Sequence, residues 1–321
     1  MKIIVSRVEP PVIVVHGGAG SWKRVFNDPD YPYTLQDISR LILESINKGY
    51  ETLNRKDALA AVVESVKVLE DSGMLNAGIG SALNIAGEAE MDAAVMDSRG
   101  NVGAVGAVKY PRNPVQLALL VALETDHVVI VGRGADMLAE KHGLEQRGVP
   151  PDHIFKRYNR LLSDLAQGKE TELRWKKILR LARLYGYLAD TVGAVALDVE
   201  GNLAVATSTG GIWLKHPGRL GDTPIIGAGF YANDMVAVTA TGYGEVITRS
   251  LASRTLAEYL ERGLSLKEAC EKTIVRAEEV GGRRVIGLIA VTRNAEVCLA
   301  YDTDGMPSGY RAKGKQFIIE L

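Results

Sequence analysis

The sequence has few cysteines and no excess of charge of either sign. Two cysteines among 321 residues, Cys270 and Cys298, exclude a disulfide framework and a four-cysteine zinc site. Lys and Arg number 38 against 39 Asp and Glu, a net charge of −1, so there is no general electrostatic reason to bind nucleic acid or an anionic membrane, and we expect neither partner. Hydrophobic residues make up 46% and charged residues 24%, which excludes a disordered or collagen-like chain.

Several motifs are also missing. No window reaches the ~18 uncharged apolar residues of a membrane-spanning helix, and the N-terminus lacks the apolar core of a signal peptide, so we expect a soluble cytoplasmic protein. The five histidines form no H-E-x-x-H pattern, and no G-x-S-x-G elbow occurs, which disfavours a catalytic zinc site and a serine hydrolase. The stretch His16-Gly-Gly-Ala-Gly20 follows a strand but lacks the G-x-G-x-x-G pattern and the P-loop lysine, so a tight turn is favoured over a nucleotide site.

Glycine, in contrast, is abundant. It accounts for 34 of 321 residues, about 11% against a usual ~7%. Much of it lies in five predicted loops, at 17–20, 78–80, 210–211, 218–229 and 242–244. Glycine lets backbone N–H and C=O groups approach a neighbouring group closely.

The hydrophobic pattern predicts a layered protein of mixed helices and strands, α/β or α+β. A length of 321 gives a prior of two domains. Expected strands span 12–15, 91–95, 102–108, 128–131 (short and buried), 236–241, 285–291 and 297–301. Expected helices begin at Thr34, with Asp37 completing a capping box, and at Asp57, and others cover 114–123, 135–142, 172–188, 244–263 and 266–280. The segment 151–190 is rich in Lys and Arg, which is typical of a solvated helix or of a linker.

A β-hairpin is predicted from 191–198 and 203–209, around a turn at Glu200-Gly201. Paired positions then sum to about 401, which places Thr209 opposite Val192, beside Thr191. Polar residues without helical periodicity concentrate between 190 and 244. There the stretch 239–244 leads from a strand into a helix, so its N–H groups point at whatever occupies the site.

These residues resemble a known family. The segments Asp190–Asp198, Thr207–Gly211, Gly218–Asp222 and Thr241–Glu245, with 16–20 and 75–80, look like the plant-type (type 2) L-asparaginase and isoaspartyl aminopeptidase family. The resemblance implies a single N-terminal-nucleophile (Ntn) hydrolase domain over 1–321, with an α+β fold that is a four-layer αββα sandwich. It further implies self-cleavage between Asp190 and Thr191 into an α subunit of 1–190, ending in a linker at 151–190, and a β subunit of 191–321. The αβ units would form a homodimer.

The resemblance also assigns roles. Thr191 would be the nucleophile, oriented by Thr209, on L-asparagine or β-aspartyl peptides. The other implied roles are the oxyanion donors Thr241 and Gly242, the carboxylate partner Arg219, the ammonium partners Asp222 and Gly244, and Asn76, which approaches the nucleophile. No cofactor is expected apart from a structural sodium held by backbone carbonyls of the Leu69–Ile79 loop.

The chemistry suits these residue types. A threonine hydroxyl is a weak nucleophile and needs a base. Cleavage before Thr191 would free an α-amine with a pKa of about 7.7–8.0, which serves as that base without a histidine. An arginine fork suits a carboxylate, and an aspartate suits an ammonium.

Some residues depart from the family pattern. Asp190 stands where glycine is common and resembles the glycosylasparaginases, whereas Gly210 points back to the asparaginases. The stretch 212–214 lacks the usual polar residue before Lys215, which bears on the leaving group, and Phe230 is bulkier than expected. Two alternatives therefore stay open: a glycosylasparaginase, and a non-enzymatic phosphate- or nucleotide-binding protein.

Overall fold

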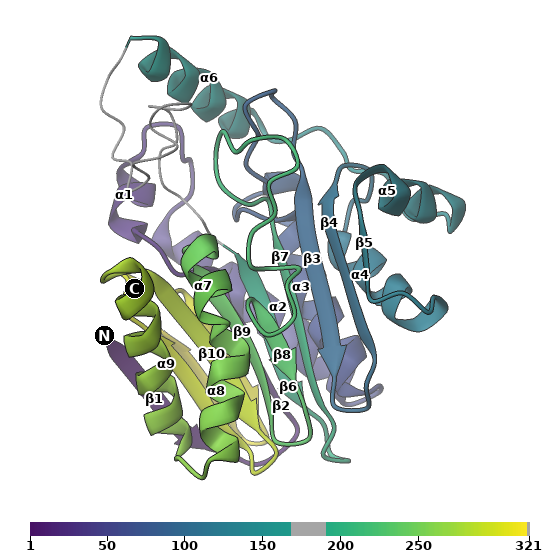
Figure 1. The fold of residues 1–321 in the computed structure, drawn as a ribbon, viewed down its shortest axis with the longest axis vertical. Coiled ribbons are helices and arrows are strands. Elements are labelled where there is room, and N and C mark those ends of the chain that lie inside the picture. The colour runs from purple at the N-terminus through teal and green to yellow at the C-terminus, as the bar shows by residue number, and fades with distance from the viewer. Residues whose placement is uncertain (168–190, 320–321) are drawn as a thin grey trace.

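Two β-sheets form the centre of the protein, and helices cover their outer faces (Figure 1). The computed structural model describes residues 1–167 and 191–319. The five-stranded sheet has the order β1-β11-β10-β9-β8, and every pairing in it is antiparallel. Its strands are β1 (Lys2–Arg7), β11 (Glu296–Tyr301), β10 (Ile286–Thr292), β9 (Val236–Gly242) and β8 (Phe230–Ala232).

The eight-stranded sheet has the order β13-β12-β2-β6-β7-β3-β4-β5, and only β4 and β5 pair in parallel. Strand β2 lies between β12 and β6, so a strand from the start of the chain is enclosed by two from its second half. The strands are β13 (Lys315–Ile319), β12 (Ser308–Ala312), β2 (Val12–His16), β6 (Val192–Leu197), β7 (Leu203–Thr209), β3 (Met91–Asp97), β4 (Val102–Val108) and β5 (Val129–Val131).

The helices divide between the two sheets by position in the chain. Most helices of the first half pack on the eight-stranded sheet, while its first and last helices only add residues to the same buried cluster, and the helices of the second half pack on the five-stranded sheet (Figure 1). The first group is α1 (Trp22–Asn27), α2 (Leu35–Leu53), α3 (Ala58–Asp71), α4 (Pro114–Glu124), α5 (Gly132–Lys141) and α6 (Asp152–Ala166); the second is α7 (Gly244–Ser250), α8 (Ala252–Glu261) and α9 (Leu266–Gly281). A short 3₁₀ turn, Gly78–Gly80, follows α3. The α+β class is thus confirmed.

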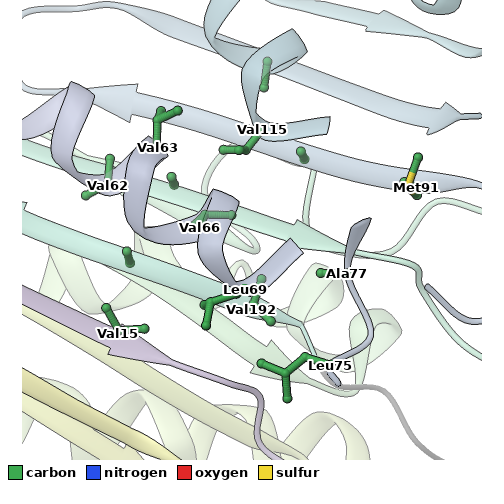
Figure 2. Packing of buried hydrophobic residues seen from close by; sticks show 14 of the residues in the cluster. Val15, Val62, Val63, Val66, Leu69, Leu75, Ala77, Met91, Val115 and Val192 are labelled. Carbon is green, nitrogen blue, oxygen red and sulfur yellow. The ribbon is translucent and has the colours of Figure 1, made fainter. Parts of the chain in front are cut away.

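Three buried clusters explain this arrangement. Along β2, Ile13 and Val15 face the helices, while Val12 and Val14 face the other sheet, as alternation along a strand requires. The first cluster lies between α2–α4 and the eight-stranded sheet; Figure 2 shows Val62, Val66 and Leu69 of α3 among its residues. The second cluster joins the two sheets, and the third lies between the five-stranded sheet and α7–α9.

The predicted helix starts are confirmed. Thr34 and Asp37 form a complete capping box on α2, and the Asp57 side chain accepts from the Ala60 N–H at the start of α3. Each cap satisfies N–H groups that the first turn of a helix leaves without a partner. Helices α4, α5 and α9 and strands β3, β4, β9, β10 and β11 lie within three residues of their predicted limits.

Two predictions about single elements are wrong. The single helix expected over 244–263 is two helices, because Leu251 adopts a left-handed conformation (φ 47°) that no α-helix contains. The N–H groups of Ser253 and Arg254 then bond to the carbonyls of Ala228 and Gly227, which fixes the start of α8. Strand β5 was expected to be buried, but Val129 and Val131 are 47% and 48% exposed because β5 is an edge strand.

The β6–β7 hairpin forms as predicted, but its register is shifted by one residue. Val192 pairs with Ser208, not with Thr209, so paired positions sum to 400. One more step along this register places Thr209 opposite Thr191. The shift moves the two threonines closer than the sequence indicated.

The segment 151–190 begins with an ordered helix. Arg160 of α6 donates to Asp28 and Asp30 at 2.6 Å each, and the Arg157 guanidinium lies 5.1 Å from the ring centre of Trp213. Helix α6 is therefore fastened to the folded body. The helix predicted at 172–188 lies outside the described residues.

Candidate active site

Thr191 lies just before β6, at the end of the eight-stranded sheet where it meets β9 of the other sheet. Thr191 is buried, with 4% of its surface exposed. The Thr241 hydroxyl, at the end of β9, donates to the Thr191 carbonyl at 3.3 Å and accepts from the Ala19 N–H at 3.1 Å. Because that hydroxyl accepts from Ala19, its own hydrogen is directed toward Thr191. The two sheets thus bring together two threonines that are 50 residues apart.

The side chain of His16 packs next to Thr191. It ends β2 and pairs with Gly193 of β6, and its Nδ1 accepts from the Gly18 N–H at 3.2 Å. Complete burial lowers the pKa of His16 to about 3, so the ring is neutral, and it contacts the backbone of Thr191. A neutral ring adds no charge next to Thr191.

The glycine-rich turn after His16 is occupied by internal hydrogen bonds. The N–H of Gly17 donates to the Pro307 carbonyl at 2.8 Å, and that of Gly20 donates to Gly305 at 3.1 Å. The two N–H groups between them bond to His16 and Thr241. All four donors of this turn are used, so it offers no cradle for a phosphate, in agreement with the expected tight turn.

Thr209 and Asn76 shape the neighbouring wall. The Thr209 hydroxyl accepts from the Gly211 N–H at 3.0 Å. Asn76 donates through Nδ2 to the Gly211 carbonyl at 2.5 Å, accepts at Oδ1 from Ala82, and accepts at its own carbonyl from Gly210. The side chain of Asn76 is thus engaged in holding the 210–211 loop beside Thr209.

A charged cluster lies a few residues beyond Thr241. Arg219 donates to Glu245 through Nε (3.1 Å) and Nη2 (2.8 Å), a two-pronged ion pair. These bonds leave the Nη1 of Arg219 for another acceptor. A Cβ at Gly244 would lie 2.8 Å from Arg219 Nη2 and 3.0 Å from Asp222 Oδ1, so three of the predicted substrate-binding residues meet at one point.

Asp222 stands out electrostatically. It is 3% exposed, and its Oδ2 has no hydrogen-bond partner among the described residues. Burial raises the pKa of Asp222 to about 7, despite the opposing effect of Arg219. A buried carboxylate oxygen without a donor is costly unless something supplies one. The arrangement is suited to an incoming cationic donor.

Two groups that support this cluster were not singled out from the sequence. Asp92 of β3 accepts from the N–H of Gly221 at 3.4 Å, between Arg219 and Asp222. Lys215 is buried, and its Nζ donates to the Glu90 carbonyl at 2.6 Å; burial lowers its pKa. A polar residue inside a predicted strand, as Asp92 is, was the available signal.

Two of the three residues at 212–214, where the chain differs from the family pattern, pack in the hydrophobic core. Trp213 and Leu214 belong to the first hydrophobic cluster, with exposures of 4% and 0%. Trp213 also lines a small cavity of about 30 Å³ with Asn76, Arg157 and His153. Phe230 is fully buried in β8, between the sheets. Asp190 lies outside the described residues.

The Leu69–Ile79 loop is tightly curled. A Cβ at Gly80 would overlap the Leu75 carbonyl oxygen and lie 3.0 Å from that of Gly73, so carbonyl oxygens crowd this turn. Oxygen ligands of this kind fit a hard cation. Across residues 1–167 and 191–319, no group of three or more His, Cys, Asp or Glu side chains is placed to hold a metal.

The described helices include none that is long and apolar enough to cross a membrane.

Comparison with known proteins agrees with this geometry. The plant-type L-asparaginase of Pyrobaculum calidifontis is 39% identical over 311 residues, 94% of this chain and 97% of that protein. The isoaspartyl peptidase of Escherichia coli K12 is 41% identical over 310 residues, covering 94% and 92%. The isoaspartyl peptidase/L-asparaginase of Xenopus laevis is 39% identical over 305 residues, covering 92% and 90%. The profile of one family, described as asparaginase, matches residues 9–319. The chain has the Thr191–Thr241 hydrogen bond and the charged cluster around Arg219, and the family match covers nearly its whole length. It therefore belongs to the asparaginase family of amidohydrolases.

Proposed function

We propose that the protein is a threonine-nucleophile amidohydrolase that acts on L-asparagine and β-aspartyl peptides. The observation that carries this proposal is the segment 241–245, which links the two ends of the site. The Thr241 hydroxyl donates to the backbone carbonyl of Thr191, the proposed nucleophile, and Glu245, four residues on, holds Arg219. A zwitterionic amino acid bound at Arg219 and Asp222 would present its side-chain amide toward the threonines. The names of the relatives support this substrate class.

The active form would arise by self-cleavage. The Thr191 hydroxyl attacks the carbonyl carbon of Asp190, the peptide nitrogen leaves as the new amine of Thr191, and water hydrolyses the resulting ester. The products are the chains 1–190 and 191–321 of one Ntn-hydrolase domain. Since α6 is fastened to the body, the dispensable linker within 151–190 would be confined to the residues after 167.

After cleavage, the amine of Thr191 would act as the base for its own hydroxyl. The hydroxyl oxygen attacks the amide carbon of the substrate, and the oxyanion is stabilised by the Thr241 hydroxyl and the Gly242 N–H. Each such donor contributes a few kcal/mol in comparable enzymes. Ammonia, or the amine of a peptide, leaves with the proton, and water then releases aspartate from the ester on Thr191.

Recognition would use charges on both substrate groups. The α-carboxylate binds the guanidinium of Arg219, whose Nε and Nη2 are already fixed by Glu245. The α-ammonium supplies donors to Asp222 and to the Gly244 carbonyl. Because the ammonium is a positive charge beside a buried carboxylate, it favours the ionised form of Asp222.

The finer architecture follows the same proposal. Three buried clusters separate helices, sheet, sheet and helices, which supports a four-layer αββα sandwich of the Ntn-hydrolase type. The curled Leu69–Ile79 loop would hold a structural sodium through backbone carbonyls, which would stiffen the wall that carries Asn76.

We further propose that two αβ units form a homodimer through the β5 edge. An unpaired strand edge with half-exposed valines favours association with another chain. Val128, Val129 and Val131 are 43–48% exposed, and Met137 of α5 is 45% exposed. Sedimentation of the wild type and of Val129→Lys tests this: we expect a dimer that the lysine weakens.

The central experiment is mass analysis of the denatured protein. We expect two chains, one beginning at Thr191, and a single intact chain for Thr191→Ala. Asparagine, a β-aspartyl dipeptide and an N-glycosyl asparagine should be assayed side by side with the same preparation. An intact wild-type chain with full amidase activity would overturn the proposal, and preference for the glycosyl substrate would favour a glycosylasparaginase.

A further inference from the structure

The only two cysteines of the chain face each other in the core of the second half. Cys270 is on α9 and Cys298 is on β11, and both are fully buried in the cluster between the five-stranded sheet and α7–α9. Their sulfur atoms are 2.7 Å apart. Cys298 lies on an inner strand, because β11 pairs with β1 on one side and with β10 on the other.

Chance is a weak explanation for this contact. A fully buried residue touches about 6–12 others, so a second cysteine placed at random among 321 residues would meet it in only about 3% of cases. Alternation along β11 also matters. Val297 and Leu299 face the other sheet, whereas Cys298 faces α9, so the side that holds the thiol is the side on which Cys270 packs.

Other roles for a cysteine pair do not fit this place. Two thiolates alone do not complete a metal site, and no additional His, Cys, Asp or Glu joins them within the described residues. Burial also raises the pKa of the Cys270 thiol well above its ordinary value, which makes it a poor nucleophile toward an external substrate. The chemistry left to the pair is a bond between the two sulfurs.

We propose that Cys270 and Cys298 form a disulfide bond that ties α9 to the five-stranded sheet. The oxidant is a small-molecule disulfide such as oxidised glutathione, which acts during folding, before the pair is buried. One thiolate attacks the oxidant and forms a mixed disulfide, releasing one thiol. The second thiolate attacks the sulfur of that protein cysteine, releasing the second thiol, so two protein thiols become one S–S bond and two small thiols are formed.

The bond would close a loop that contains β10, the strand paired with β9, whose last residues include Thr241. It would lie wholly within 191–321, so it would stabilise the second half without joining it to the first. Loop closure of this length limits the unfolded chain, and the expected effect is a melting temperature about 5 °C higher in the oxidised protein.

The test begins with the wild type synthesised as the connected chain in the presence of oxidised glutathione and then alkylated under denaturing conditions. We expect no alkylated cysteine without reductant and two after reduction, and no band on a non-reducing gel heavier than the uncut chain. Two reactive thiols before reduction, or a cross-linked dimer, would overturn the proposal.

Matched variants separate the bond from simple packing. Synthesis in dithiothreitol should lower the melting temperature of the wild type by about 5 °C, but it should leave those of Cys270→Ala and Cys298→Ala unchanged. A packing role alone predicts that dithiothreitol has no effect on any of the three. The wild-type comparison stands even if an alanine variant does not fold.

Discussion

The two ends of the proposed active site differ in charge. The nucleophile end, around Thr191 and Thr241, has neutral hydroxyls and a buried His16 whose pKa is lowered to about 3. The recognition end, around Arg219 and Asp222, is charged and holds a carboxyl whose pKa is raised to about 7. In the proposed function, catalysis and substrate recognition would therefore depend on pH separately, although the short segment 241–245 links the two ends.

The largest effect should come from the neutral end. Replacing Thr241 by valine keeps the shape but removes the donor to the oxyanion, so kcat should fall by about 10²–10³ with little change in KM. The measurement is steady-state kinetics on the cleaved fraction, with cleavage followed by mass analysis. Thr239→Val is the matched control. It lies two residues earlier on β9, is equally buried, and its hydroxyl has no hydrogen-bond partner among the described residues, so kcat should stay within a few-fold. Equal losses in both variants would contradict the assigned donor.

A smaller effect is expected at the charged end. Asp222→Asn removes the counter-charge of the substrate ammonium, and KM for asparagine should rise about 10–100-fold while kcat changes little. Asp97→Asn is the control. It alters a buried carboxylate at the end of β3 that lies away from Asp92, so KM should be unchanged. If Asp222→Asn lowered kcat and left KM intact, the division between the two ends would be wrong.

The pH dependence should separate the ends without a mutation. Because the pKa of Asp222 is raised to about 7, its ionised, ammonium-binding form is lost as pH falls below 7, and KM should rise about tenfold per unit there. The fall of kcat at low pH should instead follow protonation of the Thr191 amine, near its reference pKa of about 7.7–8.0. Full pH profiles of both constants are the measurement. Asp222→Asn should lose the KM limb and keep the kcat limb; loss of both limbs would show that they share one group.

The smallest effect concerns the support of the recognition end. Leu251, the left-handed residue between α7 and α8, is 48% exposed and holds the end of the helix that carries Glu245. Leu251→Asn should relieve strain and raise the free energy of unfolding by about 0.5–1 kcal/mol, measured by chemical denaturation. Leu251→Ala removes the side chain but keeps the strained backbone, so it should give no such gain. Kinetic constants should be unchanged in both variants.

Local patterns in the sequence were enough to predict much of the fold. The capping box at Thr34, the helix cap at Asp57, the β6–β7 hairpin and most central strands follow from nearest-neighbour chemistry, and their predictions are confirmed. The predicted pairing of the hairpin was wrong by one residue, because the identity of the turn residues limits the register only to within one residue. The break at Leu251 has no local signal, since leucine favours a helix and the break is set by contacts with residues 227 and 228.

The site shows the same limit. The resemblance named Arg219, Asp222 and Gly244, and the structure brings them together. It could not show that Glu245 holds Arg219 or that Asn76 is engaged with Gly211, because these contacts join residues 26 and 135 positions apart. Partners at such separations are decided by how the sheets meet, which is a property of the whole fold.

The interleaving of strands has a consequence for the life of the enzyme. Strand β2 of the first half lies between β12 and β6, and β1 pairs with β11, so both sheets contain strands from each side of the proposed cut. Once the chain is cut, neither piece can leave without breaking a sheet, and an unfolded enzyme would have to find its other piece in a concentration-dependent encounter. The mature protein would therefore owe its durability to slow unfolding, and its connected precursor would be the only form that folds as a single molecule.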